Sequence, residues 1–559
     1  MRSLARFRRL LSHDDATGWR RALAWTVTVL AGLLVLFALV APNQVDHLTP
    51  AAFVRIPLEG ILGAALVLAL PPKPRRITTA VAGAVLGLLT IVKFADMGFF
   101  TAFDRPWDPV SDWSFVSAGI DLLTNDLGHL GAVAVVAAIA LLVVGLLLVM
   151  ALSALRLTDL AAGHRAATTR TVAVLTAAWL VCAMPGAQLT PGQPIASTSA
   201  AGLAYAEARQ VRTEIQDQRA FAKEVTADAF RNTPGDQLLT GLRGKDVLLT
   251  FVESYGRVAI QDSDIAPRID ALLDDGTNRL RAAGFSARSA FLTSPTFGGG
   301  SWLAHSTLQS GVWINGQKRY DDLMKTDRLT LSSAFGRAGW QTVADVPAHF
   351  DDWPDASSFY HFDRYYDARN VGYQGPKFSY ASMTDQFVMS KFQQNEMRPG
   401  HAPLMAEIDL VSSHWPWAPL PQSVDWNAVG DGSVFNPMPA EGKTPDQVWT
   451  DKANIRAAYG QSIEYSLNTL ISYLQNYGDD NTVLVFLGDH QPDPAVSGAG
   501  ASRDVPITIV AKDPAVLDRI SGWNWQDGLR PDPKSPVWQM STFRDRFLTA
   551  FGPQVPPAR

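Results

Sequence analysis

The sequence predicts an α-helical membrane domain of five spans followed by a globular α/β domain. Five long apolar stretches lie before residue 190, and each is near the roughly 20 residues that a helix needs to cross a bilayer. They cover residues 23–41, 53–70, 77–99, 130–152 and 172–187. Beyond them, strand-like runs alternate with helical patterns, which predicts an α/β sandwich with a largely parallel sheet.

Three regions follow from this pattern: a five-helix transmembrane domain at residues 1–190, a juxtamembrane linker helix at 191–240 and a globular domain at 241–559. The segment Leu-Thr-Pro-Gly-Gln-Pro at 189–194 breaks the fifth apolar stretch. Residues 200–231 have the Ala, Glu, Gln and Arg content of an exposed helix, and the turn-forming residues 232–236 end it.

The charges that flank the apolar stretches predict their orientation. Positive residues gather at one set of ends: Arg2, Arg6, Arg8, Arg9, Arg20 and Arg21 before the first stretch, Lys73, Arg75 and Arg76 after the second, and Arg156, Arg165 and Arg170 after the fourth. The opposite loop 42–50 has no Lys or Arg. Because positive loops stay in the cytoplasm, five spans that start inside end outside. The globular domain is therefore predicted to be extracellular, on a multi-pass protein of the cell membrane.

Composition excludes several classes of protein. The chain is 47% hydrophobic and 18% charged, which is too apolar for a soluble enzyme alone. Its net charge of -5 does not indicate a nucleic-acid-binding protein, which is normally basic. The single cysteine, Cys182, lies in the fifth apolar stretch, so neither a disulfide within the chain nor a cysteine nucleophile is expected.

Three apolar, β-forming runs of the globular domain end on polar residues. The runs 246–252, 405–411 and 481–488 lead to Glu253, to His414 and to the pair Asp489–His490, respectively. A fourth run, 341–346, follows a predicted helix at 329–338 and leads to His349. Ligands of open α/β sheets bind outside the carboxyl ends of the strands, so these side chains are expected at one functional edge.

Glu253, Asp489 and His490 form a plausible donor set for a divalent cation, because Mn²⁺ and Zn²⁺ accept imidazole as well as carboxylate. Ser301, which ends the loop Phe-Gly-Gly-Gly-Ser, offers a hydroxyl that would complete the set. A metal-bound hydroxyl loses its proton more readily and becomes a nucleophile toward a phosphoryl or sulfuryl group. His414 and His349 would then hydrogen-bond that group or protonate the leaving oxygen.

These motifs occur in the order seen in the sulfatase-like branch of the alkaline phosphatase superfamily. They are Val-Glu-Ser-Tyr-Gly at 252–256, the Gly-rich segment ending in Ser301, Ser-His-Trp-Pro at 413–416 and Gly-Asp-His at 488–490. The whole plan most resembles lipoteichoic acid synthase and related membrane phosphoglycerol transferases, which have five spans before an extracellular catalytic domain.

The resemblance implies a role for each matching residue. Glu253, Ser301, Asp489 and His490 would hold one divalent ion, Mn²⁺ by preference, with Mg²⁺ or Zn²⁺ as alternatives. Ser301 stands where the family has its nucleophilic threonine. His414 matches a histidine that contacts phosphate, and His349 and Trp353 match a histidine and a tryptophan of the headgroup pocket.

The sequence also departs from the family. The arginine that follows the pocket tryptophan is missing, and Asp351, Asp352 and Asp355 surround Trp353 instead, which disfavours an anionic glycerophosphate. The residues after Ser301 lack the x-Pro-x-Arg signature that a sulfatase needs for formylglycine maturation. His305 lies four residues beyond Ser301. It is expected to bond to the loop, with a role as a base as the alternative.

We therefore predict a membrane-anchored, metal-dependent transferase that moves a phosphoglycerol-type unit from a lipid donor through a covalent Ser301 intermediate. The acceptor would be a cell-envelope glycolipid or polymer. One alternative is a phosphodiesterase or sulfuric-ester hydrolase of the same superfamily, in which water is the acceptor. Another is a non-catalytic binding or scaffold protein, although a decayed site should have lost at least one of the four ligands.

Overall fold

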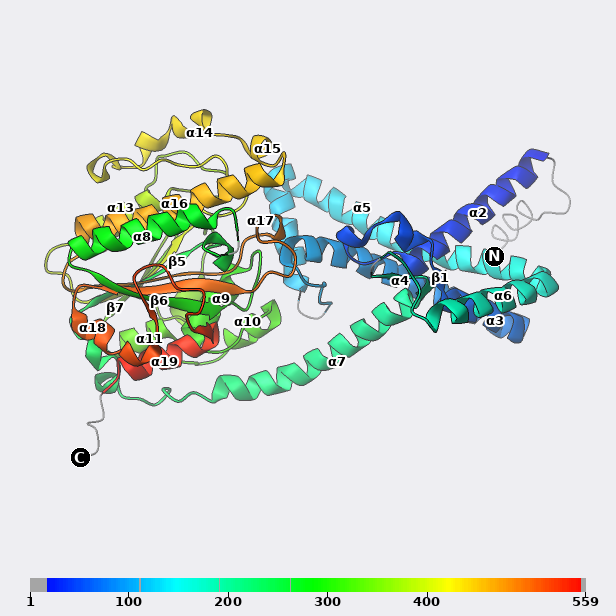
Figure 1. Cartoon of the computed structure of the whole chain (residues 1–559), viewed down its shortest axis with the longest axis horizontal. Coiled ribbons are helices and arrows are strands. Elements are labelled where there is room, and N and C mark those ends of the chain that lie inside the picture. Colours follow the sequence, from blue (N-terminus) through cyan, green and yellow to red (C-terminus); the bar gives the residue numbers. More distant parts are fainter. Residues whose placement is uncertain (1–17, 110–111, 191, 262, 554–559) are drawn as a thin grey trace. The chain divides into compact units, whose positions relative to one another are not determined.

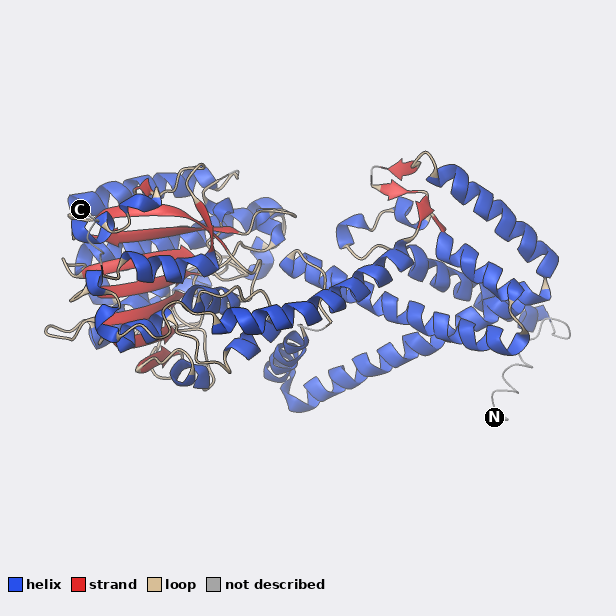
Figure 2. Ribbon diagram, turned by 90° about the horizontal axis from the view of Figure 1, so that it is seen from below, coloured by secondary structure: helices blue, strands red, loops and turns tan. Residues whose placement is uncertain are grey.

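The computed structural model describes residues 18–109, 112–190, 192–261 and 263–553. Contacts divide the chain into two compact units. One comprises residues 1–101 and 105–216, and the other comprises 102–104 and 217–559. The first unit consists mainly of long helices, and the second is built on a single large sheet (Figures 1 and 2).

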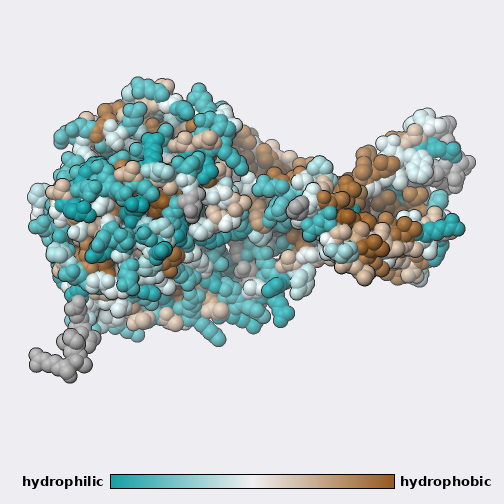
Figure 3. All heavy atoms as spheres, viewed as in Figure 1, coloured by the Kyte–Doolittle hydropathy of each residue, from teal (hydrophilic) through white to brown (hydrophobic). Residues whose placement is uncertain are grey.

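The first unit contains apolar helices. They are α2 (Gly18–Val40), α3 (Leu58–Ala69), α4 (Pro72–Phe103), α5 (Trp113–Gly163) and α6 (Arg165–Ala183), and α7 (Ser199–Thr226) follows them. Short strands β1 (Ile56–Pro57), β2 (Gln188–Thr190), β3 (Gln193–Pro194) and β4 (Ala196–Ser197) lie between them in the chain. Figure 3 shows apolar side chains gathered over these helices, whereas the surface of the second unit is largely hydrophilic.

Four described helices are long and apolar enough to cross a membrane: 18–40, 72–103, 127–163 and 165–183. They coincide with four of the five predicted spans. The remaining stretch, 53–70, forms only the 12-residue α3, because its first residues enter β1 and the prolines at 71 and 72 follow its end. At 1.5 Å per residue, α3 is shorter than a hydrocarbon core of roughly 30 Å.

The helix α3 nevertheless packs against α6. Arg165, the first residue of α6, donates from Nη2 to the Leu68 carbonyl near the end of α3, at 2.7 Å. At the other end, the Ala201 amide donates to Glu59 Oε1 at 2.8 Å. Next to it, β1 pairs in parallel with β4. Trp179, near the end of α6, donates from Nε1 to the Ser197 carbonyl of β4 at 3.4 Å. The strand β1, which precedes α3, therefore lies near the end of α6, and the two helices run in opposite directions.

The second unit is organised around a nine-stranded sheet of order β12-β6-β11-β10-β5-β9-β7-β8, with β13 also paired to β6. Its strands are β5 (Asp246–Val252), β6 (Ser286–Thr293), β7 (Gln341–Val346), β8 (Arg364–Asp367), β9 (Leu404–Leu410), β10 (Thr482–Gly488), β11 (Asp504–Ala511), β12 (Gln526–Asp527) and β13 (Val537–Gln539). Strands β10, β5, β9, β7 and β8 are parallel, and β11 is antiparallel to β10. The predicted α/β fold with a largely parallel sheet is confirmed.

Helices cover both faces of this sheet (Figure 1). One face carries α8 (Ala266–Ala282), α13 (Asp385–Glu396) and α16 (Lys452–Tyr477). The other carries α9 (Ser301–Ser310), α11 (Leu331–Arg337), α18 (Pro514–Asp518) and α19 (Phe543–Ala550). Short helices in the connections are α10 (Gln317–Leu323), α12 (Pro354–Ser358), α14 (Met438–Glu441), α15 (Pro445–Val448) and α17 (Pro494–Ser497).

Alternate residues of each central strand feed separate cores on the two faces. In β5, Leu248 and Val252 enter the core under α8 and α16, whereas Leu249 and Phe251 enter the core under α9. A strand buried on both faces is apolar throughout, which is why the sequence showed unbroken apolar runs rather than alternation.

A buried ion pair holds the segment after α7 in place within the second unit. Asp228 accepts hydrogen bonds from Nη1 and Nη2 of Arg544 at 3.1 and 3.0 Å, and Arg328 Nε lies 3.4 Å away. Arg544 is fully buried. Burial opposes ionisation of Asp228, but Arg544 and Arg328 outweigh it and hold the pKa of the carboxyl below its usual value.

We expect Arg544→Met to lower the free energy of unfolding of this unit by about 3 kcal/mol, because it leaves the buried Asp228 charge with Arg328 as its one remaining cationic partner among the described residues. Since the folded pKa of Asp228 is depressed, the pair stabilises the protein above about pH 4 and its contribution is lost as the pH falls. Denaturant unfolding of the purified chain at pH 7 and pH 3 measures both effects. The exposed pair of Arg530 and Asp274 is the control, and Arg530→Met should cost below about 1 kcal/mol.

Candidate active site

The predicted site residues meet at the carboxyl edge of the parallel strands. Glu253 directly follows β5, and Asp489 and His490 directly follow β10. These two strands are parallel neighbours in register, with Val252 opposite Gly488. A Cβ at Gly488 would lie 1.9 Å from the Tyr255 carbonyl oxygen, so only glycine allows the two strand ends to approach this closely.

Ser301 reaches the same point from the other side. Its Oγ donates to Glu253 Oε2 at 3.0 Å and lies 3.4 Å from His490 Nε2. His490 Nε2 in turn lies 3.4 Å from Glu253 Oε1 and 3.5 Å from Asp489 Oδ2. The structure therefore brings together all four residues that the sequence predicts as metal ligands.

Ser301 is the first residue of α9 and follows three glycines with positive φ. Gly300 has φ +79° and ψ +40°, the left-handed conformation that glycine adopts at little cost. This turn places the Ser301 hydroxyl at the helix N-terminus, where the helix dipole favours an anion.

The hydrogen bonds of the site identify the tautomer of His490 and leave one carboxylate oxygen of Asp489 without a hydrogen-bond partner among the described residues. His490 Nδ1 lies 2.8 Å from the Gln491 carbonyl, which must accept, so Nε2 offers its lone pair to the cluster. Asp489 Oδ1 accepts from two backbone amides, whereas Oδ2 is buried and has no hydrogen-bond partner among the described residues. Burial is the main cause that raises the pKa of Asp489 to about 6, and the nearby charge of Glu253 adds to it.

This donor set fits a divalent cation. The ligand atoms of Glu253, Asp489 and His490 lie within 4.8 Å of one another, and all three residues are buried. Two carboxylates buried side by side are costly unless a positive charge compensates them, and a lone pair from imidazole suits Mn²⁺ or Zn²⁺. The backbone carbonyl that fixes Nδ1 is the kind of partner that orients a ligating histidine.

His414 lies beyond the end of β9 and is held as a neutral imidazole. Its ring stacks on Tyr380, with centroids 3.5 Å and planes 12° apart. Nδ1 lies 2.7 Å from the Trp415 carbonyl and so carries the hydrogen. Burial lowers the pKa of His414 to about 4. At neutral pH its Nε2 can therefore accept a proton or a hydrogen bond, but it has none to donate.

His349 and Trp353 lie together on the loop after β7, two strands from Glu253 in the sheet. Their rings are 6.1 Å apart and inclined at 71°. His349 Nδ1 is buried and has no hydrogen-bond partner among the described residues, so it is available to a ligand.

An arginine that the sequence analysis missed approaches this loop. Arg369, which follows β8, donates from Nη1 to Asp352 Oδ1 at 2.9 Å and from Nη2 to Asp367 at 2.8 Å. The two carboxylates raise the pKa of its guanidinium. The sequence could have indicated this contact, because Arg369 follows the short run 364–367 by two residues. This run forms β8, the edge strand next to β7.

His305 does not bond to the loop, so the expected contact is wrong. Its Nδ1 lies 3.3 Å from Glu407 Oε1 and 3.6 Å from Asp409 Oδ1, both on β9. Residues at positions i and i+2 of a strand point to the same face, so Glu407 and Asp409 share one face of β9. The helix α9 covers this face. The sequence analysis missed Glu407 and Asp409 because the surrounding run is otherwise apolar.

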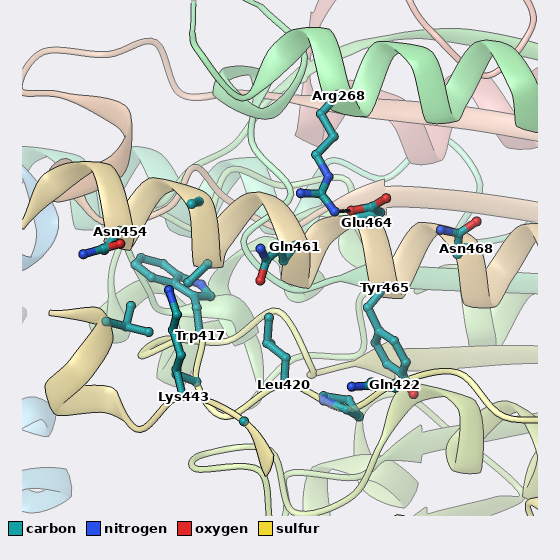
Figure 4. A pocket seen from close by; sticks show the side chains of 16 residues that line it. Arg268, Trp417, Leu420, Gln422, Lys443, Asn454, Gln461, Glu464, Tyr465 and Asn468 are labelled. Carbon is teal, nitrogen blue, oxygen red and sulfur yellow. Dashed lines mark ion pairs between the residues drawn. The ribbon is translucent and has the colours of Figure 1, made fainter. Parts of the chain in front are cut away.

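A separate cleft of about 420 Å³ lies between α16 and the loop 417–445 (Figure 4). It is lined by polar side chains such as Gln461 and Asn468, with Trp417 at its wall. The Trp417 Nε1 donates to the Ser413 carbonyl at 2.8 Å. None of the predicted site residues lines this cleft.

Fold and site define a sulfatase-like α/β domain joined to a set of apolar helices. Residues 303–504 match the family model described as Sulfatase. The resemblance inferred from the motifs is confirmed, and with it the expectation of an enzyme of this superfamily. A sequence search of curated proteins found no match.

Three solved structures illustrate the structural similarity. The lipoteichoic acid synthase LtaP of Listeria monocytogenes is 17% identical, covers 51% of this chain and 69% of its own, and has a TM-score of 0.33. The periplasmic domain of EptC from Escherichia coli is 12% identical (55% and 82% covered, TM-score 0.36). The phosphoglycerol transferase GacH of Streptococcus pyogenes is 14% identical (60% and 90% covered, TM-score 0.33). Similarities this low support no conclusion about the substrate.

We expect the purified protein to bind one Mn²⁺ per chain, and Asp489→Asn to abolish this binding because it removes the charge of a buried ligand. Elemental analysis after Mn²⁺ loading and desalting measures the content, and the thermal shift on adding Mn²⁺ gives a second readout. Asp246, at the opposite end of β5, supplies the matched control, and Asp246→Asn should retain the ion. Equal metal content in both variants would exclude this site.

Proposed function

We propose that this protein is a membrane-anchored transferase that moves a phosphoryl-headgroup unit of the phosphoglycerol type from a lipid to a cell-envelope acceptor. One observation carries the proposal: the Ser301 hydroxyl lies at the N-terminus of α9 within hydrogen-bond reach of Glu253 and His490. A hydroxyl in this setting is an activated nucleophile. The acceptor is a glycolipid or polymer of the cell envelope.

In the first half-reaction, Ser301 attacks the phosphorus of the lipid donor. Its proton passes to Glu253 Oε2, which already accepts the hydrogen bond, as the bond from Ser301 Oγ to phosphorus forms. The bond from phosphorus to the lipid oxygen breaks, and the leaving alkoxide takes a proton from water. A cation held by Glu253, Asp489 and His490 would supply charge neutralisation at the phosphoryl oxygens. The positive end of the α9 dipole would stabilise the same charge.

In the second half-reaction, the acceptor hydroxyl attacks the phosphoryl-Ser301 ester. His414 Nε2 is free to take the proton of that hydroxyl, since Nδ1 is occupied by the Trp415 carbonyl. The bond from the acceptor oxygen to phosphorus forms, the bond to Ser301 breaks, and Ser301 Oγ takes back the proton held by Glu253. His414 then releases its proton to water. An anionic phosphoryl group beside His414 raises the pKa of an imidazole, which would bring it closer to the range of an effective base.

The headgroup pocket is proposed at His349 and Trp353. His349 supplies an unpaired ring nitrogen and Trp353 an aromatic wall. Arg369 shares its positive charge between Asp352 and Asp367, which offsets part of the negative charge of the acidic loop. This supports a phosphate-bearing headgroup despite the missing family arginine.

A hydrolase of the same superfamily, with water as the acceptor, is the second candidate. It shares the first half-reaction, so the fate of the label on Ser301 separates the two. The exposed Trp415 beside His414 favours a transferase, because an aromatic surface at the site suits a large acceptor better than water.

We further propose five membrane crossings, with the catalytic domain outside the cytoplasmic membrane. The supporting observation is that α3 packs against α6 in the opposite direction, with Leu68 beside Arg165 and with β1 linked through β4 to Trp179. A short helix with extended flanks that runs alongside a span crosses the same layer. Manganese as the native ion and a lipid donor belong to the same proposal.

Cysteine labelling tests the topology in a Cys182→Ala background. We expect a cysteine at Asp46 to react with an impermeant thiol reagent on intact cells, and a cysteine at Arg75 to react only after the cells are opened, because the positive loops are cytoplasmic. Labelling at Arg75 but not at Asp46 on intact cells would invert the model.

The covalent step is tested by single-turnover reaction with labelled lipids, acid quench and mass spectrometry of the Ser301 peptide. Ser301→Ala should abolish the labelled intermediate and nearly all turnover without loss of folding. His490→Ala should cost nearly as much, and the double variant little more, because these groups act as a unit. Full activity of Ser301→Ala would exclude the mechanism. Label that passes to water despite a supplied acceptor would favour the hydrolase.

A further inference from the structure

Below Ser301, polar side chains continue along α9 into the domain. Ser301, His305 and Gln309 follow one another at intervals of four residues and therefore share one face of the helix. This face lies against the sheet: Ser301 contacts Glu253, and the other two contact Glu407. A helix that packs on a sheet normally buries apolar residues there, so a polar stripe in this position is costly unless it serves a purpose.

His305 is held on two sides. Its ring stacks on Phe251 of β5, with centroids 3.7 Å and planes 13° apart. Its edge faces β9, with Nδ1 at 3.3 Å from Glu407 Oε1 and 3.6 Å from Asp409 Oδ1. The strand register explains this fit, because Phe251 and Asp409 lie opposite each other in the β5–β9 pair.

Glu407, which pairs with His305, is itself held by further hydrogen bonds. Glu407 is buried, and its second oxygen accepts from Gln309 Nε2. The amide oxygen of Gln309 in turn accepts from the Ser332 backbone amide at 3.0 Å. Both oxygens of Glu407 are thus bound to α9, at positions one and two turns beyond Ser301.

The charges strengthen this contact. Burial alone would lower the pKa of His305, but Asp409 and Glu407 outweigh it and raise the pKa to about 9. Burial raises the pKa of Asp409 to about 7. At neutral pH His305 is therefore an imidazolium paired with at least one carboxylate, and charge-assisted hydrogen bonds are roughly twice as strong as neutral ones.

The loop before Ser301 is held by backbone contacts. The Gly298 amide donates to the Gln491 carbonyl at 2.9 Å, and the Thr296 hydroxyl donates to the Gly299 carbonyl. These contacts fix the chain up to Ser301, and the direction in which α9 leaves it is set by the contacts of α9 itself. The first contact of α9 with the charged groups of β9 is His305, one turn away.

We propose that His305 is a positioning residue for Ser301, resting on the function proposed above. The clamp of Glu407 and Asp409 ties the first turn of α9 to β9. It thereby holds Ser301 Oγ at 3.0 Å from Glu253 Oε2 and 3.4 Å from His490 Nε2.

The experiment compares two histidines that pair with acids in this sheet. His305→Asn retains an N–H near the Nδ1 position without the charge, and His305→Leu removes both. The control is His401→Asn: His401 Nε2 lies 3.1 Å from Asp246 at the opposite end of β5. The rate of Ser301 labelling is measured in single turnover with the full-length protein, per mole of folded and Mn²⁺-loaded enzyme. Donor affinity, Mn²⁺ content and thermal midpoint are measured alongside it.

We expect His305→Asn to slow labelling of Ser301 by about 10- to 100-fold, His305→Leu to slow it further, and donor affinity and Mn²⁺ content to stay unchanged, because a misplaced nucleophile loses rate rather than binding. His401→Asn should lower the thermal midpoint without changing the rate per folded enzyme. Should the His305 variants fail to fold, Glu407→Gln tests the same clamp from β9.

Three results would overturn the proposal. Equal rates in His305→Asn and His401→Asn would show a structural role alone. Two Mn²⁺ per wild-type chain and one in His305→Asn would make the cluster a cation site instead. Unchanged labelling in both His305→Leu and Glu407→Gln would show that the clamp is irrelevant. Absence of label on wild-type Ser301 would contradict the proposed transferase itself, which keeps the two failures distinguishable.

Discussion

One carboxylate oxygen joins the two strand ends on which the site depends. Asp489 Oδ1 accepts the backbone amides of Ser254 and His490, both at 2.7 Å, and so ties the end of β10 to the end of β5. Ser254 has a left-handed conformation with φ +57°, which costs free energy in a residue other than glycine. Three contacts hold it there: the bond to Asp489, its own hydroxyl bond to Glu253, and the Tyr459 hydroxyl on its carbonyl. The strained turn aims the Glu253 side chain at Ser301.

The sequence predicted the parts of this arrangement that follow from strand periodicity. Glu253, Asp489 and His490 end apolar runs, and parallel strands place such residues at one edge whatever the details of packing. Ser301 required more, since its place was inferred from a glycine-rich loop and a family resemblance. The structure accounts for it through the positive φ angles of the glycines and the start of α9.

Other features depend on contacts between distant residues, which periodicity does not reveal. Apolar content alone extended the second membrane stretch to residue 53, but two prolines and the pairing of β1 with β4 limit its helix to 12 residues. Arg369 reaches Asp352 only because β8 pairs with β7. His305 was predicted to bond to the loop because it lies one turn beyond Ser301. Its partner is instead determined by the face of β9 that α9 covers, where Glu407 and Asp409 lie.

The acids of β9 also explain why the site can concentrate negative charge without losing its structure. Glu253 and Asp489 at the edge, with Glu407 and Asp409 behind them, bring four carboxyl groups to one region of a single sheet face. His305 supplies a positive charge to the inner pair, because those carboxylates raise its pKa to about 9, and burial raises the pKa of Asp409. The outer pair lies at the point where the lone pair of His490 and the hydroxyl of Ser301 converge. A cation is therefore favoured at the edge rather than in the interior, because His305 already compensates the inner pair.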